Sequence, residues 1–116
     1  MHDKMINEIV EFADKIKKSP TYIDYLNYRS LLEAHPELLR DVNEFRRRSF
    51  EIQISHNYGV YNAYENLVHL KDEYDTLLGN PVVKEFLAAE LKLSKMISHV
   101  FESIADELDF DVDFLN

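Results

Sequence analysis

Residues 80–108 read NPVVKEFLAAELKLSKMISHVFESIADEL, and no Gly or Pro interrupts this stretch after Pro81. Asn80 is a residue type that caps helix N-termini, and Pro81 fits the first helical position, where its missing N–H costs nothing. The stretch therefore predicts one long helix from Asn80 to Leu108.

Apolar residues recur along this stretch with helical spacing on two adjacent faces. The first stripe holds Val82, Phe86, Ala89, Leu93, Met96, Ile97, Val100 and Ile104. The second stripe holds Val83, Leu87, Leu91, Phe101 and Ala105. Because a surface helix needs one stripe to pack on a core, we expect this helix to be covered from two sides. The second stripe is the expected interface with a partner or a second copy.

Four shorter helices are expected before the long one. They run from Asp3 to Lys18, from Pro20 to near Ala34, from Pro36 to about Ile54, and from Ala63 to Leu78, with Gly79 at the C′ position. The first of them has an expected buried face of Met5, Ile6, Ile9, Val10, Phe12, Ala13 and Ile16. With two Gly, three Pro and no alternating β-branched runs, the chain is not expected to form strands.

These patterns predict an all-α fold, a five-helix, bundle-like domain with a long C-terminal helix that associates as a dimer. We expect residues 1–116 to form a single domain, in which 106–116 are an acidic and aromatic tail. That tail is expected to fold back or fray, with docking to a partner as the alternative.

Composition narrows the class of protein. A net charge of −9 disfavours nucleic-acid binding, since that affinity comes largely from neutralising phosphates. The absence of Cys excludes disulfides and thiolate sites and suits a reducing compartment. No apolar run approaches the length of a membrane span, and Met-His-Asp-Lys-Met does not resemble a signal-peptide start. We therefore expect a cytoplasmic protein without membrane insertion.

Catalytic and metal-binding patterns are missing from the sequence. The five His residues show no H-E-x-x-H or E-x-x-H spacing, there is no G-x-S-x-G, and two Gly cannot form a phosphate-binding loop. We expect no catalytic residue, no metal ligand and no cofactor. Arg46, Arg47 and Arg48 point about 100° apart on a helix, and Glu44 and Glu51 lie close enough to offset them. This cluster is interpreted as solvated surface, with a protein or RNA contact as the alternative.

Two placements are unusual. Glu90 projects between the two apolar stripes of the long helix, and Arg29 projects into an apolar arc of the second helix. Because a buried carboxylate needs a cation or several donors, we expect Arg29 and Glu90 to form a buried polar pair. The alternative is a pair that faces a ligand or a partner. Tyr58 and Tyr61, which flank Gly59 in an expected turn, are candidates for an exposed partner contact.

Three segments together resemble the YlbF/YmcA family of small helical regulatory proteins of Gram-positive bacteria. They are Ser19-Pro20-Thr21-Tyr22-Ile23-Asp24-Tyr25, Pro36-Glu37-Leu38 leading to Phe45, and Asn80 through Glu90. Their order and spacing carry the resemblance, which covers nearly the whole chain. None of the segments is catalytic.

The resemblance implies a non-enzymatic cytoplasmic regulator that self-associates through its long helices or pairs with paralogous YlbF/YmcA-like proteins. It also implies a complex that promotes competence, sporulation and biofilm formation and that assists messenger-RNA processing by ribonuclease Y. Complexes of these relatives have been associated with iron–sulphur clusters bound by cysteine. This chain contains no Cys and differs from those relatives in this respect.

Our leading hypothesis is therefore a regulatory adaptor that acts through protein–protein contacts. A small-molecule-binding or sensory helical bundle, with Glu90 and Arg29 facing a cavity, is the alternative. An acid–base enzyme that uses Glu90 with a Tyr is a minor third hypothesis, which would need a cleft and a raised carboxyl pKa.

Overall fold

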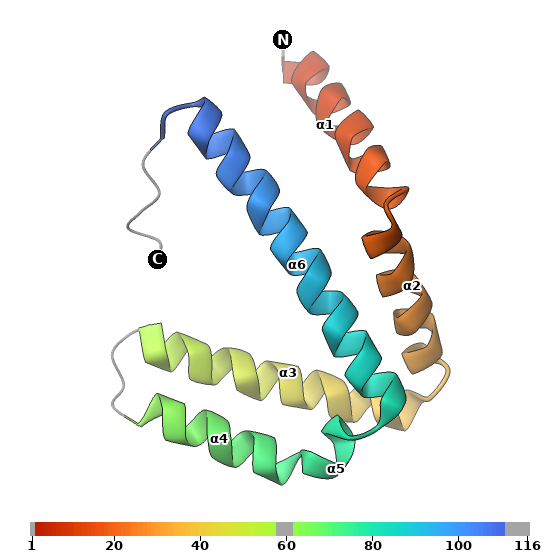
Figure 1. Ribbon diagram of the computed structural model, residues 1–116, viewed down its shortest axis with the longest axis vertical. Coiled ribbons are helices and arrows are strands. Elements are labelled where there is room, and N and C mark those ends of the chain that lie inside the picture. Colours follow the sequence, from red (N-terminus) through yellow and green to blue (C-terminus); the bar gives the residue numbers. More distant parts are fainter. Residues whose placement is uncertain (1, 58–61, 111–116) are drawn as a thin grey trace. The chain divides into compact units, whose positions relative to one another are not determined.

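The computed structural model describes residues 2–57 and 62–110, and all of its regular structure in these ranges is helical (Figure 1). The helices are α1 (His2–Lys17), α2 (Pro20–Glu33), α3 (Pro36–Asn57), α4 (Ala63–Glu73), α5 (Asp75–Leu78) and α6 (Pro81–Glu107). The prediction of an all-α fold is confirmed. Tyr58, Tyr61 and residues 111–116 of the predicted tail lie outside the described residues.

Helix starts follow the polar residues that precede each Pro. The Ser19 side-chain oxygen accepts a hydrogen bond from the Tyr22 N–H at 3.2 Å. Asn80 Oδ1 accepts from the N–H of Val82 at 2.9 Å and of Val83 at 3.4 Å. These side chains satisfy N–H groups that the first turn of a helix leaves without a partner. The predicted starts of α2 and α6 are confirmed.

A break at Tyr74 divides the helix that was predicted to run from Ala63 to Leu78. Tyr74 has φ −101° and ψ 20°, and α5 begins directly after it. Its ring packs edge-on against Phe45 of α3, with centroids 5.4 Å apart. The prediction of one uninterrupted helix is therefore wrong. The break coincides with the contact between Tyr74 and Phe45, a tertiary contact that helix propensity does not describe. Gly79 ends α5 with φ −81°, so it does not adopt the left-handed conformation expected of a C′ glycine.

The chain divides into two units of close backbone packing. The first combines Met1–Asn27 with Leu87–Asn116, and the second is Tyr28–Phe86. Both α2 and α6 contribute residues to each unit. This division concerns local packing, and a single domain over 1–116 stays a prediction.

The second unit holds a small apolar core. In Figure 1, α3 and α4 run side by side in opposite directions, and they are the helices in closest contact. Among the described residues, the largest side chains with under 2% exposure are Leu32, Val42, Val83 and Phe86. Each stabilises the fold by about 1.5–3 kcal/mol relative to an exposed position. Val42 and Phe45 of α3 are buried as well, with 0% and 8% exposure.

The first unit differs from the expectation. The face of α1 that was predicted to be buried is largely exposed, with fractions of 44–60% at Met5, Ile6, Ile9, Val10 and Phe12. The sequence correctly shows which residues share a face. It cannot show whether another part of the same chain covers that face, and among the described residues nothing buries it.

Candidate interaction surfaces

The three consecutive arginines of α3 are engaged by neighbouring groups. The Arg46 guanidinium lies over the Phe86 ring, 5.2 Å from its centroid. Arg47 bonds to Glu44 and, at 2.6 Å, to Glu51. The expected compensation by Glu44 and Glu51 is therefore present, and these contacts favour a solvated surface cluster over an RNA contact.

Arg48 connects α3 to α4. Its Nη1 lies 2.9 Å from the Glu73 carboxylate and donates to the Tyr74 hydroxyl at 3.3 Å, and its guanidinium lies 5.5 Å from the Tyr74 ring centroid. The hydrogen bonds to Glu73 and Tyr74 raise the pKa of Arg48. A hydrogen bond from Arg47 likewise lowers the pKa of Glu44. Both shifts favour the charged forms, so the Arg48–Glu73 and Arg47–Glu44 ion pairs are present at neutral pH.

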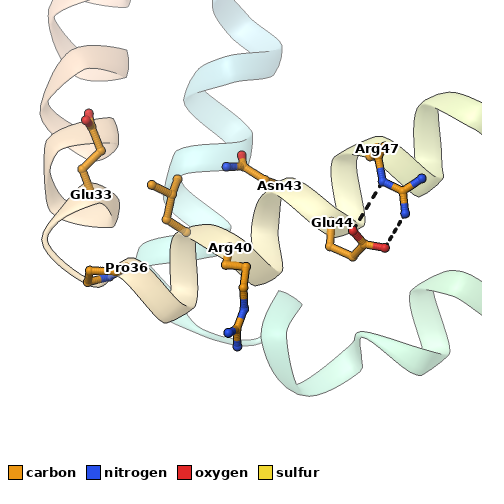
Figure 2. A pocket seen from close by; sticks show the side chains of 7 residues that line it. Glu33, Pro36, Arg40, Asn43, Glu44 and Arg47 are labelled. Atoms are coloured by element: carbon orange, nitrogen blue, oxygen red, sulfur yellow. Dashed lines mark hydrogen bonds and ion pairs between the residues drawn. The ribbon is translucent and has the colours of Figure 1, made fainter.

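Figure 2 shows an open groove of about 640 Å³ along the N-terminal half of α3. It is lined by Glu33, Pro36, Leu39, Arg40, Asn43, Glu44 and Arg47. The groove is lined by both acidic and basic side chains, and two of them, Arg47 and Glu44, bond to each other. A second groove, of about 290 Å³, lies between α3 and α4 beside Arg48 and His69. Neither groove is lined by a Ser, Thr or Tyr hydroxyl that could act as a nucleophile beside its charged groups.

Arg29 and Glu90 are not buried as predicted. The Arg29 side chain is 47% exposed and bonds to Glu33 one turn later, at 3.4 Å. Glu90 is partly exposed. Both side chains therefore reach solvent, so neither lies in the low-dielectric environment on which the prediction of a buried pair was based. Neither groove described above is lined by Arg29 or Glu90, and their pairing stays a prediction.

The residues proposed for an interface on α6 fall into two groups. Val83 and Ala105 are 0% and 5% exposed, so they pack within the chain. Leu91 and Phe101 are 55% and 54% exposed, and Leu87 is intermediate. Leu91 and Phe101 are therefore the members of the predicted set that a partner can reach.

Further large apolar side chains are exposed on the other helices. On α3 and α4, Phe50, Ile54, Tyr64 and Val68 are 38–74% exposed. The face of α1, Ile97 and Ile104 of α6, and Leu108 directly after α6 are exposed as well, which the sequence did not predict. The sequence does carry a signal for the α1 face and for the C-terminal part of α6. Apolar residues there repeat every three or four positions, as in helices that pair.

Neither a metal-binding cluster nor a membrane span is found in the described part of the chain. Within the ranges 2–57 and 62–110, no three His, Asp or Glu side chains gather so that they could hold a metal ion. His35 Nδ1 lies 3.1 Å from the Leu31 carbonyl oxygen within its own helix turn. Over the same ranges, no helix is both long enough and apolar enough to span a bilayer.

Exposed apolar helix faces of this extent are typical of helical proteins that bind other proteins, membranes or ligands through them. The chain belongs to the family described as "Control of competence regulator ComK, YlbF/YmcA", whose model matches residues 5–109. This is a family of regulatory proteins, and the resemblance noted in the sequence is confirmed.

Curated relatives extend across most of the chain. It is 28% identical over 98 residues to a UPF0342 protein of Desulfitobacterium hafniense, an alignment that covers 84% of this chain and 79% of the relative. A UPF0342 protein of Caldicellulosiruptor bescii is 25% identical over 100 residues, with 86% and 84% covered. Another from Symbiobacterium thermophilum is 24% identical over 110 residues, with 95% and 98% covered. No solved structure matches the chain significantly.

Proposed function

We propose that this protein is a non-enzymatic regulatory adaptor of the cytoplasm that acts through protein–protein contacts. The observation that carries the proposal is the family match over residues 5–109. The exposed apolar faces of α1 and α6 support it, because they offer surface for association. The grooves of the second unit supply paired charges rather than a catalytic constellation.

The adaptor forms a homodimer or a hetero-complex with paralogous YlbF/YmcA-like chains, and α6 contributes the contact. Leu91 and Phe101 are the side chains available for it, since each exposes more than half of its surface. Aromatic side chains such as Phe101 are enriched in protein interfaces.

By resemblance to YlbF and YmcA, the complex assists messenger-RNA processing by ribonuclease Y and influences competence, sporulation and biofilm formation. The protein itself does not bind RNA in this scheme. Its net charge of −9 and the pairing of Arg47 and Arg48 with acids of the same chain support a contact with protein instead.

A deletion strain complemented with tagged variants tests this function. We expect the tagged wild-type chain to co-purify with ribonuclease Y and with YlbF/YmcA-like chains. We also expect deletion to change the processing of the messenger RNAs that ribonuclease Y cleaves. The Phe101→Glu variant should lose these partners, because it places a charge in an apolar contact. His99→Glu adds the same charge on the polar side of α6 and should retain them. Unchanged transcripts in the deletion strain, with no partner recovered, would refute the adaptor role.

A further inference from the structure

One side of α3 carries a repeat that the core does not use. Its members are spaced alternately four and three residues apart: Pro36, Arg40, Asn43, Arg47, Phe50 and Ile54. At about 100° per residue, they lie within roughly 80° of the helix circumference. They form a strip about 27 Å long at 1.5 Å per residue, which we call the outer strip. The buried residues Val42 and Phe45 lie on a different side of α3.

The outer strip is accessible, and all of it belongs to the second unit. Phe50 and Ile54 are 61% and 38% exposed, and the side chains of Arg40 and Arg47 are 74% and 56% exposed. The larger of the two grooves runs along its N-terminal half, where Figure 2 shows Arg40, Asn43 and Arg47. A partner can therefore reach the strip along its length.

The repeat of the outer strip favours a helix as the partner. Helices that pack along their length contact each other through residues spaced four and three apart. Phe50 and Ile54 supply apolar contacts at one end of the strip, and Pro36 supplies one at the other end. Asn43 lies between them, and a polar residue within such a seam fixes the register of the paired helices.

The charged members of the outer strip are both Arg. Arg40 Nε lies 3.5 Å from Asp41, and Arg47 bonds to Glu44 and Glu51. Exposed pairs of this kind contribute little to stability, so a partner's carboxylate can join or replace them at small cost. Arg40 and Arg47 are seven residues apart, about 10 Å along α3. Acids at the same spacing on a facing helix would complement both.

We propose that the outer strip of α3 binds a helix of another protein, one that carries acidic residues seven positions apart beside an apolar seam. The apolar seam packs on Phe50 and Ile54, and the acids pair with Arg40 and Arg47. This contact is separate from the α6 contact of the proposed function. It gives the adaptor a second surface, with a different choice of partner.

Charge disfavours the other occupants of the outer strip. The same strip of a second copy would bring Arg against Arg. A nucleic acid or an anionic membrane would meet Glu37, Glu44 and Glu51, which follow one edge of the strip, in a chain of net charge −9. Helices that lie on membranes also need a free apolar face opposite their cations, whereas the opposite face of α3 contains the buried Phe45.

Two designed peptides probe this surface. The first has about three heptads with Leu at the two seam positions and Glu at the two flanking positions of each heptad. The second has Lys in place of Glu. Fluorescence anisotropy of each labelled peptide, titrated with the full chain, measures binding. The Glu peptide should bind roughly tenfold more tightly, because two attractions replace two repulsions.

Reversing one charge of the strip tests the pairing itself. Arg40→Glu should weaken binding of the Glu peptide roughly fivefold and strengthen binding of the Lys peptide. Lys71→Glu makes the same change of charge at an exposed position of α4 and should leave both affinities unchanged. Because the Arg40 side chain is 74% exposed, its replacement should not affect folding.

Replacing Phe50 tests the apolar contact. Phe50→Ser should weaken binding of both peptides, whereas Tyr64→Ser removes an exposed aromatic ring from α4 and should not. Circular dichroism verifies that each variant keeps its helix content. If Phe50→Ser loses helix content, the exchange of peptide preference in Arg40→Glu decides the proposal, since unfolding cannot strengthen binding of the Lys peptide.

Equal binding of the two peptides would overturn the choice of an acidic partner. Binding of the Glu peptide that is unchanged in both Arg40→Glu and Phe50→Ser would place the peptide on another face and overturn the proposal. A chain that recovers its partners through Phe101 but does not bind the Glu peptide would overturn the outer strip alone and leave the proposed function intact.

The remaining occupants give distinct results. Binding of single-stranded RNA or of phosphatidylglycerol vesicles that is lost in Arg40→Glu but kept in Lys71→Glu would assign the strip to a polyanion and overturn the proposal. Light scattering in which Phe50→Ser, but not Tyr64→Ser, has a lower mass than the wild type would assign the strip to a second copy, which also overturns it.

Discussion

Single residues set where the longest helix begins. Asn80 Oδ1 accepts hydrogen bonds from two N–H groups of the first turn of α6, and Pro81 occupies the first helical position. Both roles are local, because they depend on residues two or three positions apart. For this reason the sequence was sufficient to predict the start of α6.

Replacing Asn80 by Ala should lower the free energy of unfolding by about 1 kcal/mol, since the cap is lost and the two N–H groups lose their acceptor. Asn80→Asp keeps an oxygen acceptor and adds a negative charge beside a helix N-terminus, so it should be at least as stable as the wild type. Urea unfolding at a fixed protein concentration measures both changes. Equal midpoints for the Ala and Asp variants would contradict the capping role.

The other end of α6 depends on a strained residue. Asp109 has φ 53°, a left-handed conformation that costs a side-chain-bearing residue about 1–2 kcal/mol. It lies in a helix-ending turn in which the Asp109 N–H donates to the Asp106 carbonyl and the Phe110 N–H donates to the Ala105 carbonyl. Glycine is the usual residue at such a position.

Asp109→Gly should therefore raise the free energy of unfolding by about 1 kcal/mol, because glycine adopts this conformation without steric cost. Removing a negative charge from a helix C-terminus should add to the gain. Asp109→Ala removes the same charge but keeps the Cβ atom, and it separates the two contributions. Thermal unfolding of both variants measures this difference. An Ala variant as stable as the Gly variant would show that the backbone strain is unimportant.

Helices as elements were predictable from periodicity, Pro positions and capping residues, while their interruptions were not. The break at Tyr74 accompanies a ring that packs on Phe45 and Arg48, residues distant in sequence. Local propensity does not contain such tertiary contacts. The predicted number of helices was accordingly one too low for the described chain.

Pairing between α3 and α4 should depend on Arg48. Its guanidinium bonds to both Glu73 and the Tyr74 hydroxyl, a geometry that a Lys ammonium does not reproduce. Arg48→Lys and Arg48→Met should both lower the urea midpoint. The effect of Arg48→Met should be smaller in a Glu73→Gln background, because the ion pair is already absent there.

Arg40→Met serves as the control for this series. The Arg40 side chain is 74% exposed and pairs with the adjacent Asp41, so its removal should leave the midpoint unchanged. If Arg48→Met were as harmful in the Glu73→Gln background as in the wild type, the ion pair would not be coupled to stability.

At the scale of the whole molecule, the sequence predicted which residues share a face better than it predicted burial. Phe86, on the first apolar stripe of α6, is buried as expected, whereas Val83, which was predicted to contact a partner, is buried in the core of the second unit. Met5, Ile9 and Phe101 have equally apolar patterns and are exposed. Periodicity identifies a face that needs covering, but the covering can come from the same chain or from another one.

The expected buried pair of Arg29 and Glu90 illustrates the same limit. Each residue lies within an apolar arc on a helical projection, which suggested burial. A projection describes one helix in isolation, whereas burial depends on what lies opposite that arc. Arg29 is half exposed and bonds to Glu33, a residue of its own helix.

Hydrogen exchange at two protein concentrations tests most directly whether α1 and α6 are covered by a second copy. We expect amide protection in α1 and in the Ile97–Leu108 part of α6 to rise with concentration. Protection at the centre of the α3–α4 pair, where Phe45 and Leu70 are buried, should stay constant. Protection in α1 and α6 that is the same at both concentrations, in a chain of monomer mass, would contradict a covering by a second copy.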